Sequence, residues 1–159
     1  MIANDALDLS IFIMDNLGLD SNAHALSEYA KAELLIFQNK LDESIEKLTI
    51  LGNLYSEHGL NDDILYLKAK LYEKKRDYLT AEELYQHIVD TFPEEIRADN
   101  ALYNMAQLYE HQLANPEKAK ACYEKLFMEY TDSTFAIDAR KRFRILRGDF
   151  DVDEHERMQ

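Results

Sequence analysis

The chain has 159 residues, of which 47% are hydrophobic, and it carries a formal net charge of -13. This length and composition predict one domain that buries a core, and the single cysteine, Cys122, excludes an internal disulfide. The negative charge disfavours phosphate backbones and anionic lipid, so no nucleic-acid partner is expected. Only four glycines and two prolines occur, which is typical of helices joined by short turns, with no sheet.

The first predicted helix covers residues 5–17 and is apolar around most of its circumference. Its apolar residues are Leu7, Leu9, Ile11, Phe12, Ile13, Met14 and Leu17. A helix of this kind is normally covered on two sides, so we expect either a homodimer through it or coverage by residues upstream of Met1.

The start of the chain bears on the compartment. The first Lys or Arg is Lys31, so the charged region of a secretory signal is missing. No apolar run near the start reaches the roughly 20 residues that span a bilayer, so no membrane insertion is expected. The compartment stays open: cytoplasmic if the chain is complete, and periplasmic or cell envelope if it is a fragment of an exported protein.

Seven further helices are predicted from the helical period of the apolar residues, over residues 22–38, 42–58, 62–75, 80–91, 95–112, 116–130 and 133–147. Asn61 and Asn115 precede two of them as expected caps, and Gly18, Gly59 and Gly148 fall where helices should stop.

One layout recurs along these helices. Ala32, Ala69 and Ala106 in the first helix of each pair lie 37 residues apart. The second helices each carry a stripe that begins with a small residue and ends with an aromatic one: Ser44, Leu48, Leu51 and Tyr55; Ala81, Tyr85, Ile88 and Phe92; Ala119, Tyr123, Leu126 and Tyr130. A period of this length predicts helical hairpins that bury their apolar faces on neighbouring copies.

These residues resemble the tetratricopeptide repeat. Ala69, Tyr72, Ala81, Tyr85 and Pro93 match its pattern; Ala106, Tyr109, Ala119, Tyr123 and Thr131 form a second copy, and Ala32, Leu35, Ser44 and Leu48 a weaker third. The unit is about three residues longer than the usual 34. It is similar in this to a long-helix bacterial subclass that includes BamD and YbgF, and to the C-terminal part of large Bacteroidetes-type tetratricopeptide proteins. The resemblance implies an all-α fold, a right-handed superhelical α-α solenoid.

We therefore expect a single domain over residues 1–148, followed by an acidic flexible tail over 149–159. Its parts are an N-terminal helix (1–20), three units (21–60, 61–94 and 95–131) and a capping helix (132–148). Phe143 stands where a further unit would need a small residue, which favours a cap. The basic residues around it indicate an outward-facing terminal helix, or alternatively a site for an anion or acidic peptide.

A column of tyrosines marks the candidate binding face. In tetratricopeptide arrays the first helices line a concave groove that holds a peptide. The resemblance therefore implies a peptide-binding face made by Tyr29, Glu33, Tyr66, Lys70, Tyr103 and Gln107. The alternative is that the tyrosines pack between successive units.

The sequence offers little for catalysis. No two histidines are spaced as a helical metal site, and neither a glycine-rich phosphate loop nor a nucleophile elbow occurs. Asp149, Asp151 and Asp153 begin like a calcium loop, but Glu154 replaces the required glycine. We expect no enzyme activity, no metal and no cofactor.

The sequence thus predicts a non-catalytic scaffold that binds a peptide or helix of a protein partner, as part of a larger bacterial assembly. The alternative is a structural C-terminal module of a longer chain, or a homo-oligomerisation module without a peptide ligand.

Overall fold

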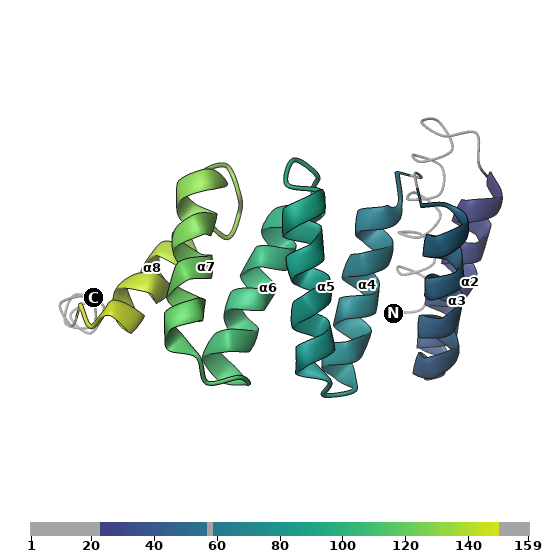
Figure 1. Cartoon of the computed structure of the whole chain (residues 1–159), viewed down its shortest axis with the longest axis horizontal. Coiled ribbons are helices and arrows are strands. Elements are labelled where there is room, and N and C mark those ends of the chain that lie inside the picture. Colours follow the sequence, from purple (N-terminus) through teal and green to yellow (C-terminus); the bar gives the residue numbers. More distant parts are fainter. Residues whose placement is uncertain (1–22, 57–58, 150–159) are drawn as a thin grey trace. The chain divides into compact units, whose positions relative to one another are not determined.

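The computed structural model describes residues 23–56 and 59–149, and these form seven helices and no strand. The helices are α2 (Ala23–Phe37), α3 (Leu41–Leu54), α4 (Asn61–Lys74), α5 (Tyr78–Thr91), α6 (Arg97–His111), α7 (Pro116–Glu129) and α8 (Ala136–Arg147) (Figure 1). The predicted helix over 5–17 and the predicted tail after Asp149 lie outside the described residues. The all-α class is confirmed.

The chain divides into two compact units, with the boundary between Ile64 and Leu65. The first unit contains the α2–α3 hairpin and the start of α4. The second contains the rest of α4 and the helices from α5 to α8, where α5 packs on α6, α6 on α7 and α7 on α8 (Figure 1). The single domain expected over residues 1–148 stays a prediction.

The turn inside each hairpin is built in the same way. Asn39, Arg76 and Ala114 hold the same place in the three turns, and all have left-handed backbone, with φ of 58°, 64° and 48°. In the first two turns the next residue is Lys40 or Asp77. Its backbone amide donates a hydrogen bond of 2.9 Å to the carbonyl of the residue five positions earlier. Because the left-handed region is unfavourable for residues with a Cβ, these turns carry a conformational cost that packing must offset.

Two of the second helices begin at side-chain caps. Asp77 accepts a hydrogen bond from the Thr80 amide at 3.3 Å, and Asn115 accepts one from the Lys118 amide at 3.1 Å. The predicted cap at Asn115 is confirmed. The predicted cap at Asn61 is wrong. That residue opens α4, and its side-chain amide donates to the backbone carbonyls of Tyr55 and Ser56 at the end of α3.

In the first unit the hairpin closes over a buried polar contact. Ser44 is fully buried, and its hydroxyl donates to the carbonyl of Ala32 at 2.8 Å. Asp62 is also buried, at 7% exposure, and the apolar core residues of this unit are Ala25, Leu26, Tyr29, Ala32, Ile45, Leu48, Leu51, Leu60 and Ile64. Since the hydroxyl has a partner, a serine can occupy the helix crossing without an unsatisfied polar group.

In the second unit the crossings are made by pairs of alanines. Ala69 and Ala81 belong to one crossing, and Ala106 and Ala119 to the next, all with no exposed area. Around them a continuous apolar core runs from α4 to α8 and includes the fully buried rings of Tyr85 and Tyr123. A methyl group at the crossing lets the two backbones approach closely.

The last helix, α8, ends this core. Ala139 is fully buried, Phe143 packs on Phe127 with ring centroids 5.5 Å apart, and Gly148 closes the helix with φ of 92°. The basic residues have partners within the chain: Arg142 pairs with Glu110, Arg144 and Arg147 pair with Asp149, and Arg140 lies over the Phe127 ring. The predicted stop at Gly148 is confirmed.

Candidate protein-interaction surface

Two tyrosine clusters with the same geometry lie on the second unit. In the first cluster, the rings of Tyr66 on α4 and Tyr85 on α5 are 5.9 Å apart. The Tyr85 hydroxyl donates to the carboxylate of Glu73, and Lys70 Nζ lies 3.5 Å from the same carboxylate. The buried tyrosine of the second helix is thus held by a carboxylate of the first helix.

The second cluster repeats this arrangement one hairpin later. The rings of Tyr103 on α6 and Tyr123 on α7 are 6.2 Å apart, and the Tyr123 hydroxyl donates to Glu110 at 2.7 Å. Gln107, in the place of Lys70, donates to the Tyr123 hydroxyl at 2.6 Å. Arg142 from α8 pairs with Glu110, whose side chain is only 8% exposed.

Each first-helix tyrosine also contacts the next first helix. The Tyr66 hydroxyl accepts a hydrogen bond from Asn104 at 2.8 Å, and the guanidinium of Arg97 lies 4.9 Å from its ring centroid. One repeat later, the Tyr103 hydroxyl donates to Asp138 at 2.6 Å and its ring stacks on Phe135 at 4.5 Å. These tyrosines therefore contribute to packing between successive hairpins of the second unit.

Burial and carboxylate bonding set the ionisation of these side chains. Burial, and then the hydrogen bond to Asp138, raise the pKa of Tyr103 to about 12. Burial, and then Glu73, raise the pKa of Tyr85 far above its usual value, and burial does the same for Tyr123. The phenols stay neutral at physiological pH and act as hydrogen-bonding groups.

The six residues predicted for the binding face divide between the two units. Tyr66, Lys70, Tyr103 and Gln107 come together on the second unit, around the two tyrosine clusters. Tyr29 and Glu33 belong to α2 of the first unit, where Tyr29 is only 5% exposed and Glu33 is half-buried. Their role in binding stays a prediction.

Glu73 and Glu110 are not among the six residues predicted for this face. The structure makes them the hydrogen-bond acceptors of the two clusters. The signal was present, because each lies seven residues after the column tyrosine of its helix. Asn104, Arg97, Phe135 and Asp138 carried no comparable signal, since their contacts depend on how one hairpin packs on the next.

Other features of the described residues concern metal binding, membrane crossing and the one cysteine. Among residues 23–56 and 59–149, no group of three His, Cys, Asp or Glu side chains could hold a metal ion. None of the helices that the structure describes has the length and apolar character needed to cross a bilayer. Burial raises the pKa of the Cys122 thiol to about 11, which suits a packed side chain and not a nucleophile.

Comparison with known proteins agrees with this arrangement of hairpins. Residues 63–95 and 99–128 each match a family model of the tetratricopeptide repeat. A crystal structure of a tetratricopeptide repeat protein from Parabacteroides merdae ATCC 43184 is similar, with a TM-score of 0.65 and 23% identity. The match covers 89% of this chain and 52% of that chain, so this chain spans about half the length of its structural relative. No curated protein matches the chain.

At this identity the structural likeness shows the fold, and the family models show the repeats. Tetratricopeptide repeats are generally protein-protein interaction modules, and proteins of this kind are generally non-catalytic scaffolds. Residues 63–95 and 99–128 are therefore each similar to a tetratricopeptide repeat, and in the second unit α5 packs on α6 and α6 on α7 as neighbouring helical hairpins.

Proposed function

We propose that the chain is a non-catalytic scaffold whose second unit binds a peptide or helix of a protein partner along the first helices α4 and α6. One observation carries the proposal: the first helices of the two tyrosine clusters repeat a tyrosine, a polar residue four positions later and a glutamate seven positions later, 37 residues apart. A partner that lies across α4 and α6 would contact Tyr66 and Lys70 on the first of these helices. It would then contact the corresponding pair, Tyr103 and Gln107, on the second. A repeated pattern of side chains of this kind suits an extended or helical ligand with its own period.

The chemistry of the face favours a partner that accepts hydrogen bonds. Lys70 is 42% exposed and carries three donor protons. The Tyr66 hydroxyl accepts a hydrogen bond from Asn104 and has a proton of its own that it could donate to a partner. Backbone carbonyls of a peptide are suitable acceptors for both. The net charge of -13 further favours a neutral or basic partner sequence.

The same positions of the first unit belong to Tyr29 and Glu33. Because Tyr29 is buried, Glu33 is the more accessible of the two side chains. We propose both as contacts of the first unit by itself, at the positions that Tyr66 and Lys70 hold in the second unit. Membership of a larger bacterial assembly is proposed from the interaction role that tetratricopeptide repeats generally have.

Site-specific photo-cross-linking tests the face directly. Benzoylphenylalanine is introduced at Lys70 or Gln107 in the tagged full chain, and cross-linked partners are captured from lysate of the source cells. His87 on α5 and Ala121 on α7 are exposed and serve as matched control positions. We expect a discrete adduct from positions 70 and 107 and none from the controls; equal adducts from all four positions would contradict the proposal.

Substitution of the two polar side chains that follow the tyrosines gives an independent test. Lys70→Ala combined with Gln107→Ala should reduce partner capture about tenfold, which corresponds to about 1.4 kcal/mol. Circular dichroism checks that the variant keeps its helices. The pair Glu83→Ala and Gln86→Ala, exposed on α5, is the control. Unchanged capture by a folded Lys70 and Gln107 variant rules out this face.

A second candidate function is structural. The helix predicted over residues 5–17 is apolar around most of its circumference, and on this prediction we propose as the alternative a module that completes a longer array or a homo-oligomer and binds no foreign peptide. Sedimentation of the purified chain over a hundredfold range of concentration tests the oligomer. A mass that rises with concentration supports self-association, and a monomer throughout excludes it.

A further inference from the structure

The last helix, α8, carries a basic surface on an acidic chain. It holds five basic residues and one acidic residue, whereas the net charge of the chain is -13. One side of the helix is formed by residues that are spaced 3, 4 and 3 positions apart. This outer row consists of Ile137, Arg140, Arg144 and Arg147. All four side chains are exposed, and Ile137 is 87% exposed.

The register of α8 relative to α6 follows from the turns that precede them. In the turn before α6, the amides of Glu95 and Ala98 donate to carbonyls three residues earlier. In the turn before α8, the amides of Ser133 and Ala136 do the same. Equivalent residues of the two segments are therefore 38 positions apart. The extra residue lies in the turn between α6 and α7, which has four residues where the turn between α4 and α5 has three.

This register corrects the position predicted for Phe143. That residue corresponds to Met105, and the place of the crossing residue Ala106 is taken by Arg144. Phe143 packs on the Phe127 ring, and α8 packs on α7 along this side (Figure 1). The inner side of α8 is therefore closed by α7, and the outer row points away from it.

The outer row stands where α6 receives the second helix of its own hairpin. The correspondences are of Arg140 to Leu102, of Arg144 to Ala106 and of Arg147 to Tyr109. In α6 these positions are at most 5% exposed. In α8 the side chains of Arg144 and Arg147 are 49% and 56% exposed. An apolar helix on the outer row would remove guanidinium groups from water, which is unfavourable without matching charges.

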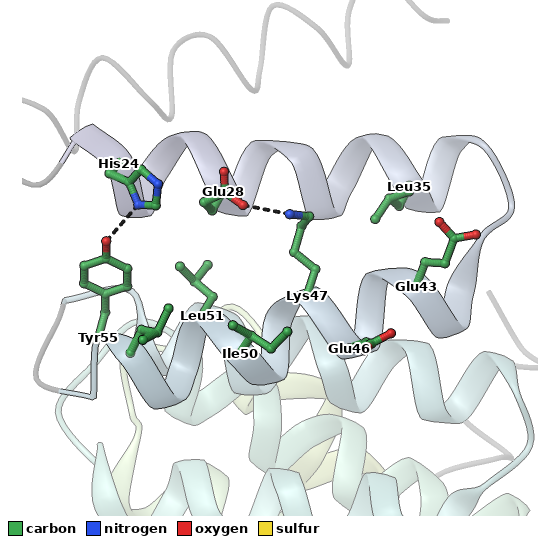
Figure 2. Close-up of a pocket in the computed structure, with 10 residues that line it drawn as sticks. His24, Glu28, Leu35, Glu43, Glu46, Lys47, Ile50, Leu51 and Tyr55 are labelled. Carbon is green, nitrogen blue, oxygen red and sulfur yellow. Dashed lines mark hydrogen bonds and ion pairs between the residues drawn. The ribbon is translucent and has the colours of Figure 1, made fainter.

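The first hairpin shows how a charged residue at this position is matched. Glu28 holds in α2 the position that Leu102 holds in α6 and Arg140 in α8. It pairs with Lys47 of α3 at 2.7 Å, across a groove of about 310 Å³ between the two helices, as Figure 2 shows. The charge of the first helix is thus paired with an opposite charge from the second helix. On α8 the sign is reversed, so the matching group of a helix packed there is a carboxylate.

The arginines of α8 already bind carboxylates within the chain. Arg142 pairs with Glu110, and Arg147 Nε donates to Asp149 at 3.1 Å. Arg144 Nε lies 3.6 Å from the Asp149 carboxylate, and hydrogen bonds from Arg147 lower the pKa of Asp149 below its usual value. Guanidinium groups suit carboxylates because their planar donors can form two parallel hydrogen bonds.

We propose that the outer row of α8 binds an acidic amphipathic helix of a protein partner, whose carboxylates pair with Arg140 and Arg144 and whose apolar residues pack on Ile137. The partner helix takes the place that the second helix takes in the other hairpins. Its charge complements the outer row, whereas the acidic remainder of the chain repels it. This inference does not depend on the face proposed on α4 and α6, which favours a neutral or basic partner.

Binding of a synthetic probe to the full chain tests the proposal. The probe is a fluorescein-labelled, alanine-rich helical peptide with glutamates four and three positions apart and leucines beside them. In fluorescence anisotropy at low salt, Arg140→Gln combined with Arg144→Gln should weaken binding at least about fivefold, because two ion pairs are lost. Lys40→Gln combined with Lys74→Gln makes the same change in net charge at exposed positions elsewhere. This control should leave binding within about twofold of the unaltered chain.

A substitution that strengthens binding makes the test independent of lost folding. Asp149→Asn releases Arg144 and Arg147 from their internal carboxylate and should tighten binding of the probe at least about threefold. Asp90→Asn, exposed on α5, is the charge-matched control and should have no such effect. Circular dichroism checks that every variant keeps its helices.

Each outcome supports or overturns the proposal. Equal binding by the arginine variant and its lysine control overturns it, and so does a lack of saturable binding to the unaltered chain. A proline-interrupted probe of the same composition that binds as tightly would show attraction of anions in general and overturn the choice of a helix.

Two further outcomes concern other occupants of the outer row. Binding that appears only after Asp151, Asp153 and Glu154 are changed to amides would assign the row to the chain itself. Self-association in sedimentation that the arginine variant loses would assign it to a second copy. Either result overturns the assignment to a separate partner.

Discussion

The hairpins α2–α3 and α6–α7 share one backbone layout but are closed by different chemistry. The position of Leu102 in the later hairpin is taken by Glu28 in the earlier one, and the position of Cys122 by Lys47. In α6–α7 these side chains are buried, whereas in α2–α3 they form an ion pair across an open groove. The repeat therefore allows few residue types at the helix crossing and many more on the surface beside it.

The point where the two helices of a hairpin cross shows which property of the repeat is strictly required. Ala106 and Ala119 meet in the later hairpin, and Ala32 and Ser44 in the earlier one, all with no exposed area. Serine is accepted because it is small and because its hydroxyl donates to the Ala32 carbonyl. Size is the strict requirement at this point, and polarity is tolerated where a partner exists.

The largest expected effect comes from removing the buried tyrosine of the later hairpin. Tyr123→Ala should lower the free energy of unfolding by about 3–5 kcal/mol, because it empties a fully buried ring site. Tyr123→Phe keeps the ring and should cost about 1–2 kcal/mol, through the lost bonds to Gln107 and Glu110. Urea unfolding followed by circular dichroism measures both. Equal losses would show that the hydroxyl, and not the ring, stabilises this hairpin.

A bulkier residue at the crossing should have the next largest effect. Ala106→Leu should cost about 1–3 kcal/mol, because a branched side chain forces the two backbones apart. Ala121→Leu, on the exposed side of α7, should stay within about 0.5 kcal/mol of the parent chain. The same urea titration distinguishes them. A tolerated leucine at position 106 would mean that the crossing is looser than the buried alanines indicate.

The left-handed turns should respond in the opposite direction. Ala114→Gly should stabilise the chain by about 0.5–1 kcal/mol, because glycine adopts φ of 48° without the cost that a Cβ brings. Asn39→Gly in the earlier hairpin should gain less, since asparagine tolerates this region. Thermal unfolding measures the shift. Ala121→Gly, inside α7, is the control and should lower stability by up to about 1 kcal/mol.

Alkaline pH should weaken the later hairpin. The folded pKa of Tyr103 is about 12, above the unfolded value of 10. Its contribution is therefore fully present below about pH 10 and is lost as the pH rises toward 12. Tyr103→Phe should flatten this part of a plot of thermal midpoint against pH. A plot that keeps its slope would assign the loss to other groups.

Acid should produce the smallest effect, and in the earlier hairpin. Hydrogen bonds from Lys31 and Lys47 lower the pKa of Glu28 to about 2, from 4.5 when unfolded. The contribution of this carboxylate is present above about pH 4.5 and is lost as the pH falls toward 2. Glu28→Gln should reduce the dependence of the thermal midpoint on pH in this window. A matched Glu43→Gln variant, at an exposed position on α3, should not.

Most of the helical framework could be predicted from the sequence, because the 37-residue period is carried by buried residues. Two boundaries show the limits. The helix predicted to reach residue 58 ends at Leu54, where Asn61 binds the carbonyls that follow it. The last helix begins at Ala136 and not at residue 133. Both differences arise in turns, where side-chain hydrogen bonds that leave no periodic trace decide where a helix starts or stops.

The candidate face was predictable in part for the same reason. The column of Tyr66 and Tyr103 follows from the period, and so does the polar residue four positions later. Their partners Asn104 and Asp138 do not, because those bonds depend on the offset between neighbouring hairpins. Sequence periodicity fixes which residues share a helix face, but the depth to which a neighbouring helix covers that face is a property of packing.

The buried Cys122 gives this chain an internal probe. At 9% exposure its reaction with a thiol reagent should be slow while the α6–α7 hairpin is closed and faster when it opens. The rate of its modification in the unaltered protein would thus report the opening free energy of one hairpin, with no label added. Comparison with global unfolding would then show whether the array melts as a whole or hairpin by hairpin.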